Sequence, residues 1–449
     1  MNNRDIEWHG KKLEQFRREI ESGQLNALRE LLSDEVVRQI CEESGYCFRT
    51  RLLTPLATIF HMLSAAISRE GSFQGAWQMN GQVGRSGSLS DARKRLPLAV
   101  WEQLYAWMLN EIGREPGAGK RWRGHRMIGL DGTFVSMSDE TELADHFGRW
   151  NSKSGSSRFP QARVVVAFEL ESLVNIGHET DACRTSEKKL SQEVLKNFKK
   201  GDVAVFDRLF AGANLYGEYQ QAGVDFIGRA HACLKVERLK ALEIFSSGDR
   251  VVDLPVDARY LREDPTLPKT VVVRMIRTTA KIDGRRESFW VATSLLDPQK
   301  YPAAEIIGWQ KKRWKVETLI EEMKIWLGAD ILRSKTAEGI YKEIYARIIG
   351  LNLIHWLILK AADRHHEEPD RLSVSSALRL AVSYSLKMST APVWQLRLLY
   401  DQMLERIAKS KVPYRPNRLE PRMKKREPRN YPRLKITRSE WRMAMAMMP

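Results

Sequence analysis

Residues 127–137 read MIGLDGTFVSM, and the apolar run in this stretch ends at Asp131. Together with ARVVVAFEL and SLVNIGH, which follow it in the chain, the stretch predicts three successive β-strands. A helical pattern, SEKKLSQEVLKNF, then leads to a fourth strand, DVAVF, and NLYGEYQQAG predicts a helix before a fifth strand, VDFIGRA. This order of strands and helices predicts an α/β fold built on one sheet.

The pattern changes on both sides of this sheet. Short β-rich pieces such as KTVVVRMIRTT and ESFWVATSLL predict an all-β insertion, and three- and four-residue apolar spacing before and after the core predicts helices. The expected domains are a helical N-terminal DNA-binding domain (1–113), a Gly- and Pro-containing linker (114–126), the first part of the core (127–232), the β insertion (233–302), the second part of the core (303–364), and C-terminal helices with a basic tail (365–449).

The chain of 449 residues carries 73 Lys and Arg against 56 Asp and Glu, a net charge of +17. This excess predicts a polyanionic partner, with nucleic acid favoured over a membrane surface. Two basic segments are candidates for phosphate contacts, although each could also be a solvated surface without a ligand. They are Arg93, Lys94 and Arg95 on a short helix that Ser90 can cap, and Lys424, Lys425 and Arg426 in the tail.

Four scattered cysteines without CxxC spacing predict neither a disulfide framework nor a zinc site, so we expect a reducing cytoplasm. The first residues, MNNRDIEWHGKK, do not form an apolar signal segment. The most apolar stretch, IIGLNLIHWLILKAA, is interrupted by Asn352 and His355 and predicts a buried helix, with no membrane span.

Three carboxylates are candidates for chemistry. Asp131 and Asp207 stand where β-runs stop, and ligand sites in open α/β sheets gather outside the carboxyl ends of strands. Glu317 lies in the helical pattern WQKKRWKVETLIEEMK (309–324), which places Arg313 and Lys324 on the same face. Hard oxygen donors of this kind hold the Mg2+ ions that assist phosphodiester cleavage. The alternatives are turn or capping aspartates and an ordinary ion-paired amphipathic helix.

In this order, the three acidic residues resemble the Asp-Asp-Glu triad of the insertion-sequence-4 family of bacterial transposases. The family signature Y-x2-R-x3-E-x6-K aligns with Arg313, Glu317 and Lys324, whereas Gln310 stands where the family has Tyr. CFRTRLLTP, SLSDARKRLP, LDGTFVSM, FDRLFAG, VATSLLDPQKYPAAEI and YPRLK are also similar to the family, so that the resemblance covers nearly the whole chain.

The resemblance implies a ribonuclease-H-like catalytic core in which Asp131, Asp207 and Glu317 hold two Mg2+ or Mn2+ ions. It implies cut-and-paste transposition, in which the ends of the element are cleaved, pass through a DNA hairpin and are joined to target DNA. Its partners would be double-stranded DNA, as transposon end repeats and target, and a second copy of the chain in a homodimer, at the nucleoid of the bacterial cytoplasm.

Several residues would contact DNA on this reading. Trp290, in the insertion, could stack on a flipped base or pack in the core, and stacking is worth roughly 1 to 3 kcal/mol per base. The contacts expected around the signature involve Gln310, Arg313, Trp314 and Lys324.

Two other functions remain open. The chain could be a catalytically silent, transposase-derived DNA-binding protein, with Gln310 marking the departure from the signature. It could also be a stand-alone metal nuclease, which would share the carboxylates but leave the helical N-terminal domain unexplained. Cleavage without joining would favour the nuclease, and binding without cleavage would favour the silent protein.

Overall fold

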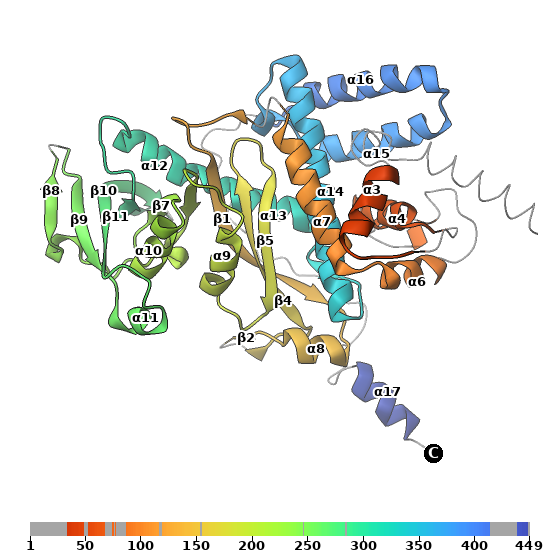
Figure 1. The fold of residues 1–449 in the computed structure, drawn as a ribbon, viewed down its shortest axis with the longest axis horizontal. Helices are drawn as coiled ribbons and strands as arrows, with labels where there is room; N and C mark the ends of the chain where they lie inside the picture. Colours follow the sequence, from red (N-terminus) through yellow and green to blue (C-terminus); the bar gives the residue numbers. More distant parts are fainter. Residues whose placement is uncertain are drawn as a thin grey trace, which may run out of the picture. The chain divides into compact units, whose positions relative to one another are not determined.

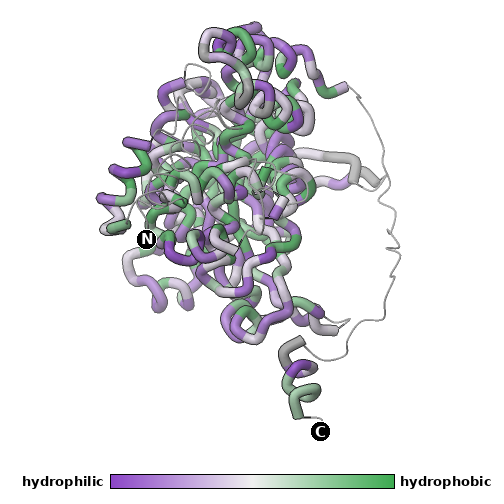
Figure 2. Tube along the Cα trace, turned by 90° about the vertical axis from the view of Figure 1, so that its right-hand side faces the viewer, coloured by the Kyte–Doolittle hydropathy of each residue, from purple (hydrophilic) through white to green (hydrophobic). Residues whose placement is uncertain are grey.

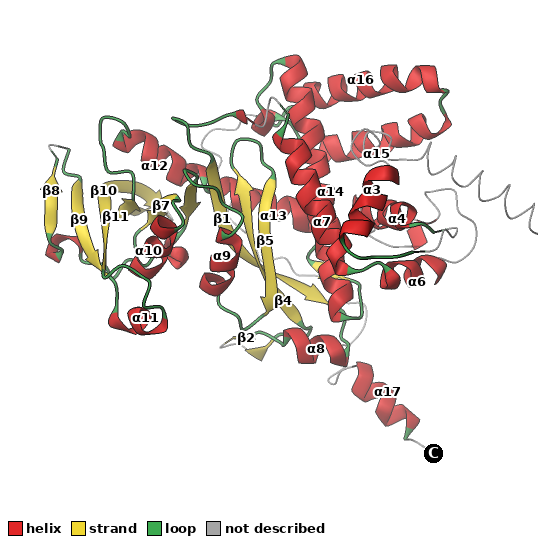
Figure 3. Ribbon diagram, viewed as in Figure 1, coloured by secondary structure: helices red, strands yellow, loops and turns green. Residues whose placement is uncertain are grey.

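The computed structural model describes residues 34–48, 53–67, 74–75, 77, 87–115, 119–152, 155–245, 247–282, 285–413 and 438–447. The chain forms two compact units, each made of segments that are distant in sequence. Unit 1 comprises Met1–Ala106, Ser136–Gln161 and Gly328–Pro449, and unit 2 comprises Trp107–Val135 and Ala162–Leu327. Helices and a large sheet occur together, as Figure 3 shows, so the expected α/β class is confirmed.

The sheet of unit 2 has the strand order β5-β4-β1-β6-β7-β11-β10-β9-β8. Strands β1, β6 and β7 are parallel, whereas β4 and β5 pair antiparallel. All five core strands expected from the sequence are present. The strands are β1 (Met127–Met137), β4 (Gln161–Glu169), β5 (Asn175–Ala182), β6 (Val203–Phe206), β7 (Asp225–Arg229), β8 (Ala241–Ile244), β9 (Arg250–Pro255), β10 (Thr270–Ile282) and β11 (Arg285–Thr293).

The insertion continues the same sheet, because β11 pairs antiparallel with β7, and β10, β9 and β8 follow in turn. It is not all-β. A short helix, α11 (Ala258–Glu263), and the 3-10 turn η3 (Val236–Arg238) lie within it. Asp257 begins α11 by accepting a hydrogen bond from the backbone N–H of Arg259, an N-cap that the strand pattern did not reveal.

Helices cover both faces of the core sheet. Successive side chains of β1 point to opposite faces, so β1 contacts the helices on both sides. Ile128 and Leu130 pack in one hydrophobic cluster with residues of α9 (Glu187–Leu195) and α10 (Ala213–Gln221). Gly129, between them, faces the opposite side, where α13 (Trp314–Ile325) follows α12 (Ala303–Lys312). Figure 1 shows these two pairs of helices against the strands.

The second half of the predicted linker is built into unit 2. Trp122 Nε1 donates a hydrogen bond of 2.7 Å to Glu305, and the ring of His125 lies between the Gly201 carbonyl and the Tyr301 hydroxyl, 2.8 Å from each. Residues 119–126 are therefore anchored side by side with the start of α12.

Unit 1 is mainly helical, and α14 (Ala337–His365) is its central helix, with contacts to α4, α15 and α16. By length and hydropathy α14 could cross a membrane, the one such helix in the described part of the chain, but 89% of its apolar window is buried inside the protein. Asn352 and His355 are completely buried. Figure 2 colours the chain by hydropathy, with hydrophobic stretches in green. The buried helix expected from the sequence is confirmed.

The remaining elements are α3 (Asp34–Glu43), α4 (Pro55–Ile67), α6 (Gly87–Arg95), α7 (Leu98–Gly113), α8 (Thr141–Phe147), β2 (Asn151–Ser152), β3 (Gly155–Ser156), β12 (Ile331–Leu332), η4 (Pro369–Arg371), α15 (Val374–Thr390), α16 (Val393–Lys409) and α17 (Arg438–Ala446). Helix α7 begins in unit 1 and ends in unit 2.

Candidate active site

Asp131 does not end its strand, as the sequence suggested, but lies in the middle of β1. The strand continues because Val135 and Met137 are buried and because Ser136 and Met137 pair with β12. The ladder between β1 and β6 explains why the position still suits a site. Met127 pairs with Val203 and Gly129 with Val205, so the same register, continued, sets Asp131 opposite Asp207.

Asp207 is the first residue after β6, and it also caps the 3-10 turn η2 (Arg208–Phe210). Its Oδ1 atom accepts a hydrogen bond of 2.8 Å from the backbone N–H of Leu209. Asp207 therefore has the capping role that was the alternative expected from the sequence. It leaves the second carboxylate oxygen available for other partners, so both interpretations of this aspartate are compatible.

Glu317 joins this site through Arg313. Arg313 ends α12 and begins α13, and Glu317 lies one helical turn after it on α13. Arg313 donates a 2.8 Å hydrogen bond to Glu317 Oε1 and a 3.2 Å hydrogen bond to Asp131 Oδ2. Because Arg313 is 8% exposed, its guanidinium forms a buried bridge between the two carboxylates.

A glycine lets α13 come close to the sheet. A Cβ atom on Gly129 would lie 2.3 Å from Val316 Cγ2 and 2.8 Å from Leu170 Cδ2, so that no side chain fits there. Val316 directly precedes Glu317. The approach of α13 that carries Glu317 toward Asp131 therefore depends on the missing side chain at Gly129.

Gln310, where the family has Tyr, has a defined place in the site. Its Nε2 donates a 3.1 Å hydrogen bond to the carbonyl oxygen of Phe206, the residue that precedes Asp207. This bond ties α12 to the end of β6. The substitution in the signature thus provides a contact that supports the segment carrying Asp207.

The electrostatics of the site favour a cation. Burial raises the pKa of Asp131 to about 6, and repulsion from Asp207 and Glu317 adds to the rise, while the Gly132 N–H and Arg313 oppose it. Asp131 thus interacts with two other carboxylates and with one guanidinium. Mg2+ and Mn2+ bind hard oxygen ligands, and the carboxylates here carry more negative charge than the one guanidinium neutralises. The carboxylate oxygens therefore fit these ions by their chemistry. Within the described ranges, however, no three acidic, His or Cys side chains stand close enough to enclose a metal.

The other residues expected to contact DNA near the signature lie in different environments. Trp314 is 61% exposed, directly beside Arg313, and Lys324 lies in the last turn of α13. Trp290, on β11, packs partly against the hydrophobic cluster of unit 2. The guanidinium groups of Arg250 and Arg277 approach its ring to 5.5 and 5.9 Å, so Trp290 has both a packing role and a cationic surrounding.

The basic helix α6 of unit 1 is only partly available for DNA. Arg93 is half-buried and donates a 3.1 Å hydrogen bond to Ser334, and the ammonium group of Lys342 contacts the Arg93 and Lys94 carbonyls. Arg93 therefore belongs to the packing of unit 1, whereas the side chains of Lys94 and Arg95 are exposed. Lys424, Lys425 and Arg426 lie outside the described residues.

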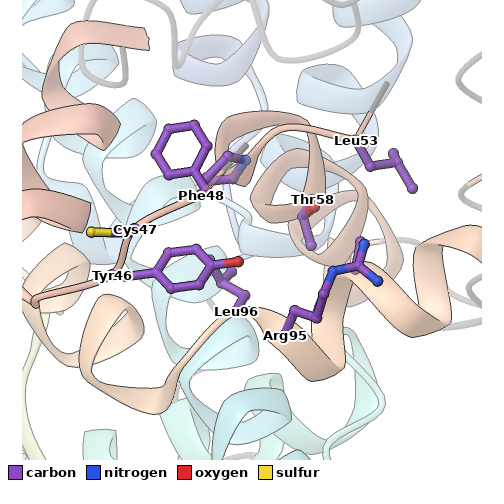
Figure 4. Close-up of a pocket in the computed structure, with 9 residues that line it drawn as sticks. Tyr46, Cys47, Phe48, Leu53, Thr58, Arg95 and Leu96 are labelled. Atoms are coloured by element: carbon purple, nitrogen blue, oxygen red, sulfur yellow. The ribbon is translucent and has the colours of Figure 1, made fainter. Parts of the chain in front are cut away.

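Two segments that carried the sequence resemblance, CFRTRLLTP and SLSDARKRLP, meet in unit 1. Described residues of both segments, together with the adjacent Tyr46, line a cavity of about 310 Å3, in which Tyr46 and Phe48 form one wall and Arg95 stands opposite (Figure 4). The two aromatic rings are stacked with their centroids 6.0 Å apart. The motifs are thus linked by their position in space, which their separation in the sequence did not indicate.

One charged pair beside the site was missed by the sequence analysis. Arg163 on β4 and Glu187 on α9 form an ion pair of 3.2 Å, and Glu187 interacts electrostatically with Asp207. No motif or spacing in the sequence marks Glu187, because a Glu in the first turn of a helix is common for reasons of helix stability alone.

The chain is similar to a known protein family and to named proteins. The model of the transposase DDE domain family matches residues 122–353. The chain is 22% identical over 317 residues to the transposase InsG for insertion sequence element IS4 of Escherichia coli K12, a match that covers 69% of this chain and 70% of that relative. The resemblance to the insertion-sequence-4 family is confirmed.

A second curated relative is "Probable transposase for insertion sequence element IS5377" of Geobacillus stearothermophilus, which is 21% identical over 342 residues, 74% of this chain and 84% of the relative. Among solved structures, a chain of the cryo-EM structure of the piggyBac transposase synaptic complex with hairpin DNA aligns with 86% of this chain and 85% of its own length. Its TM-score is 0.46 at 9% identity, and no conclusion rests on so remote a likeness.

Proposed function

The chain belongs to the transposase DDE domain family, and we propose that it is a DNA transposase that binds the terminal inverted repeats of an insertion sequence, cleaves the ends and joins them to target DNA. The observation that supports this proposal is the convergence in unit 2 of Asp131, Asp207 and Glu317, residues that are far apart in the sequence. The strand order β5-β4-β1-β6-β7, with Asp131 on the first strand and Asp207 after the fourth, is what a ribonuclease-H-like core would give.

The chain's own residues would act on the phosphodiester in distinct ways. Asp131, Asp207 and Glu317 would hold two Mg2+ or Mn2+ ions, which supply an activated water and neutralise charge on the phosphate. Arg313 restrains Asp131 and Glu317 through hydrogen bonds, and it would keep positive charge beside the reacting phosphate. The hydrogen bond from Gln310 to Phe206 holds the end of β6, and with it Asp207, in place.

The finer steps follow from the family resemblance. Cleavage would proceed through a DNA hairpin, with Trp290 as the candidate to stack on a flipped base, and two copies of the chain would pair two element ends. Exposed Lys94 and Arg95, together with the basic tail, would add phosphate contacts. The N-terminal segment 1–113 would serve as a DNA-binding domain.

An end-cleavage assay tests the proposal. The DNA flanking the gene should contain imperfect inverted repeats, and a duplex with that sequence should be nicked by the purified chain in the presence of Mg2+. Asp131→Asn should abolish nicking while the affinity for the duplex stays the same. Nicking near the wild-type rate in that variant would remove Asp131 from the catalytic site.

A second candidate is a DNA-binding protein that has lost catalysis, and Gln310 in place of the signature Tyr is the observation that favours it. Specific binding of the inverted repeats without nicking in Mg2+ or Mn2+ would support this candidate. Restoration of cleavage by Gln310→Tyr would identify Gln310 as the cause of the loss.

A further inference from the structure

Glu187 lies against the residue that follows Asp131. A Cβ atom on Gly132 would be 2.6 Å from the carboxyl carbon of Glu187 and 2.8 Å from its Oε1. Gly132 does not have a positive φ angle, so its backbone conformation does not require glycine. The physical reason for the glycine in the LDGT motif is therefore the close approach of the Glu187 carboxylate.

The position of Glu187 is fixed from several sides. Ser186 caps α9 by accepting a hydrogen bond from the backbone N–H of Lys189, which makes Glu187 the first residue of the helix. Helix α9 also packs against η2, the turn that Asp207 caps. Glu187 thus lies against Gly132, the residue that follows Asp131, and interacts electrostatically with Asp207.

Arg163 supplies the counter-charge for this carboxylate. It donates a 3.2 Å hydrogen bond to Glu187 Oε1, and the two side chains are 12% and 19% exposed. The Arg163 guanidinium also lies 4.5 Å from the centroid of the Phe134 ring on β1. These contacts hold the glutamate next to the strand that carries Asp131.

We propose that Glu187 is a fourth carboxylate of the catalytic site, which binds, directly or through a water, the divalent cation held by Asp131 and Asp207. This inference rests on the proposed function. Mg2+ and Mn2+ prefer oxygen ligands, and Mg2+ usually keeps several of its own waters. A carboxylate that hydrogen-bonds to one of those waters can therefore still contribute to binding of the ion. Arg163 balances the charge of Glu187 when the cation is absent.

Binding of Mn2+ to the full chain, measured by electron paramagnetic resonance, tests this role. Glu187→Gln keeps the size of the side chain and removes its charge, and we expect Mn2+ affinity to fall by about tenfold or more, the scale typical of residues that support metal ligands. The Mg2+ concentration for half-maximal end cleavage should rise by a similar factor, while DNA affinity stays unchanged. Glu193→Gln is the matched control, since Glu193 lies on the same helix, has a side chain that is 45% exposed and pairs with Lys196.

The outcomes separate the two proposals. Equal Mn2+ affinity in Glu187→Gln and Glu193→Gln, with Asp131→Asn losing Mn2+, would overturn the role of Glu187 and leave the proposed function intact. A wild-type chain that binds no Mn2+ would overturn both. If Glu187→Gln does not fold, Glu187→Asp serves instead: weaker Mn2+ binding at an unchanged melting temperature supports the role, and wild-type affinity overturns it.

Discussion

Without metal, Asp131 should destabilise the protein at neutral pH. Its pKa is raised from 3.8 to about 6, so the folded state holds the charged carboxylate less favourably than the unfolded chain does. A rise of this size in the pKa corresponds to about 3 kcal/mol. Asp131→Asn should therefore raise the free energy of unfolding of unit 2 by up to about 3 kcal/mol at pH 7.5 in EDTA.

The sign of the pH dependence follows from the raised pKa. The contribution of this group to stability is fully present below pH 3.8 and is lost as the pH rises through about 6, since the folded state then has to release a proton that it binds more tightly. The difference between wild type and Asp131→Asn should thus be large at pH 7.5 and small near pH 4. A divalent cation should reduce it by stabilising the wild-type carboxylate.

Urea titrations followed by hydrogen–deuterium exchange of peptides from β1 and β6 would report on unit 2 alone. Asp202→Asn is a control of opposite sign, because Asp202 is buried and accepts two hydrogen bonds from Arg126. Breaking such a pair should destabilise unit 2 by about 3 to 5 kcal/mol. An Asp131→Asn variant that is less stable than wild type at pH 7.5 in EDTA would refute the reasoning about burial and repulsion at this site.

Three further predictions concern the supports of the site and the tail. Gly129→Ala should destabilise unit 2 by about 1 to 3 kcal/mol in urea titrations, because the new methyl group meets Val316. It should also slow end cleavage more than it weakens DNA binding. The control Gly119→Ala places its methyl group in open space and should leave stability unchanged. Gln310→Ala should cost about 1 kcal/mol of stability, through loss of the donor to Phe206, and an unchanged urea midpoint would exclude that contact. Truncation after residue 413, beyond the end of α16, should flatten the plot of log DNA affinity against log salt concentration. The slope should fall in magnitude by about 0.9 for each phosphate contact that the tail makes. An unchanged slope would show that the tail does not bind DNA.

The sequence predicted the parts of this protein that depend on local pattern. Alternating and helical periodicities identified the five core strands, the helix of the signature and the buried helix α14, because these periods are set by backbone geometry within each segment. It failed for α11 and for the true end of β1, where a single capping Asp and a pairing with β12 decided the outcome. The periodicity of apolar residues indicates neither a helix cap nor the partner of a strand.

The candidate site shows the same division. The ends of the β-runs, the helical spacing and the family resemblance together selected Asp131, Asp207 and Glu317, and the catalytic roles of these residues remain predictions. Only the tertiary structure set Asp131 opposite Asp207, through the β1–β6 register, and placed Arg313 between two carboxylates. It alone brought Glu187 against Gly132. Such contacts join residues from separate elements, and they arise from strand register and close packing, which act across the chain and leave no repeating signal in the sequence.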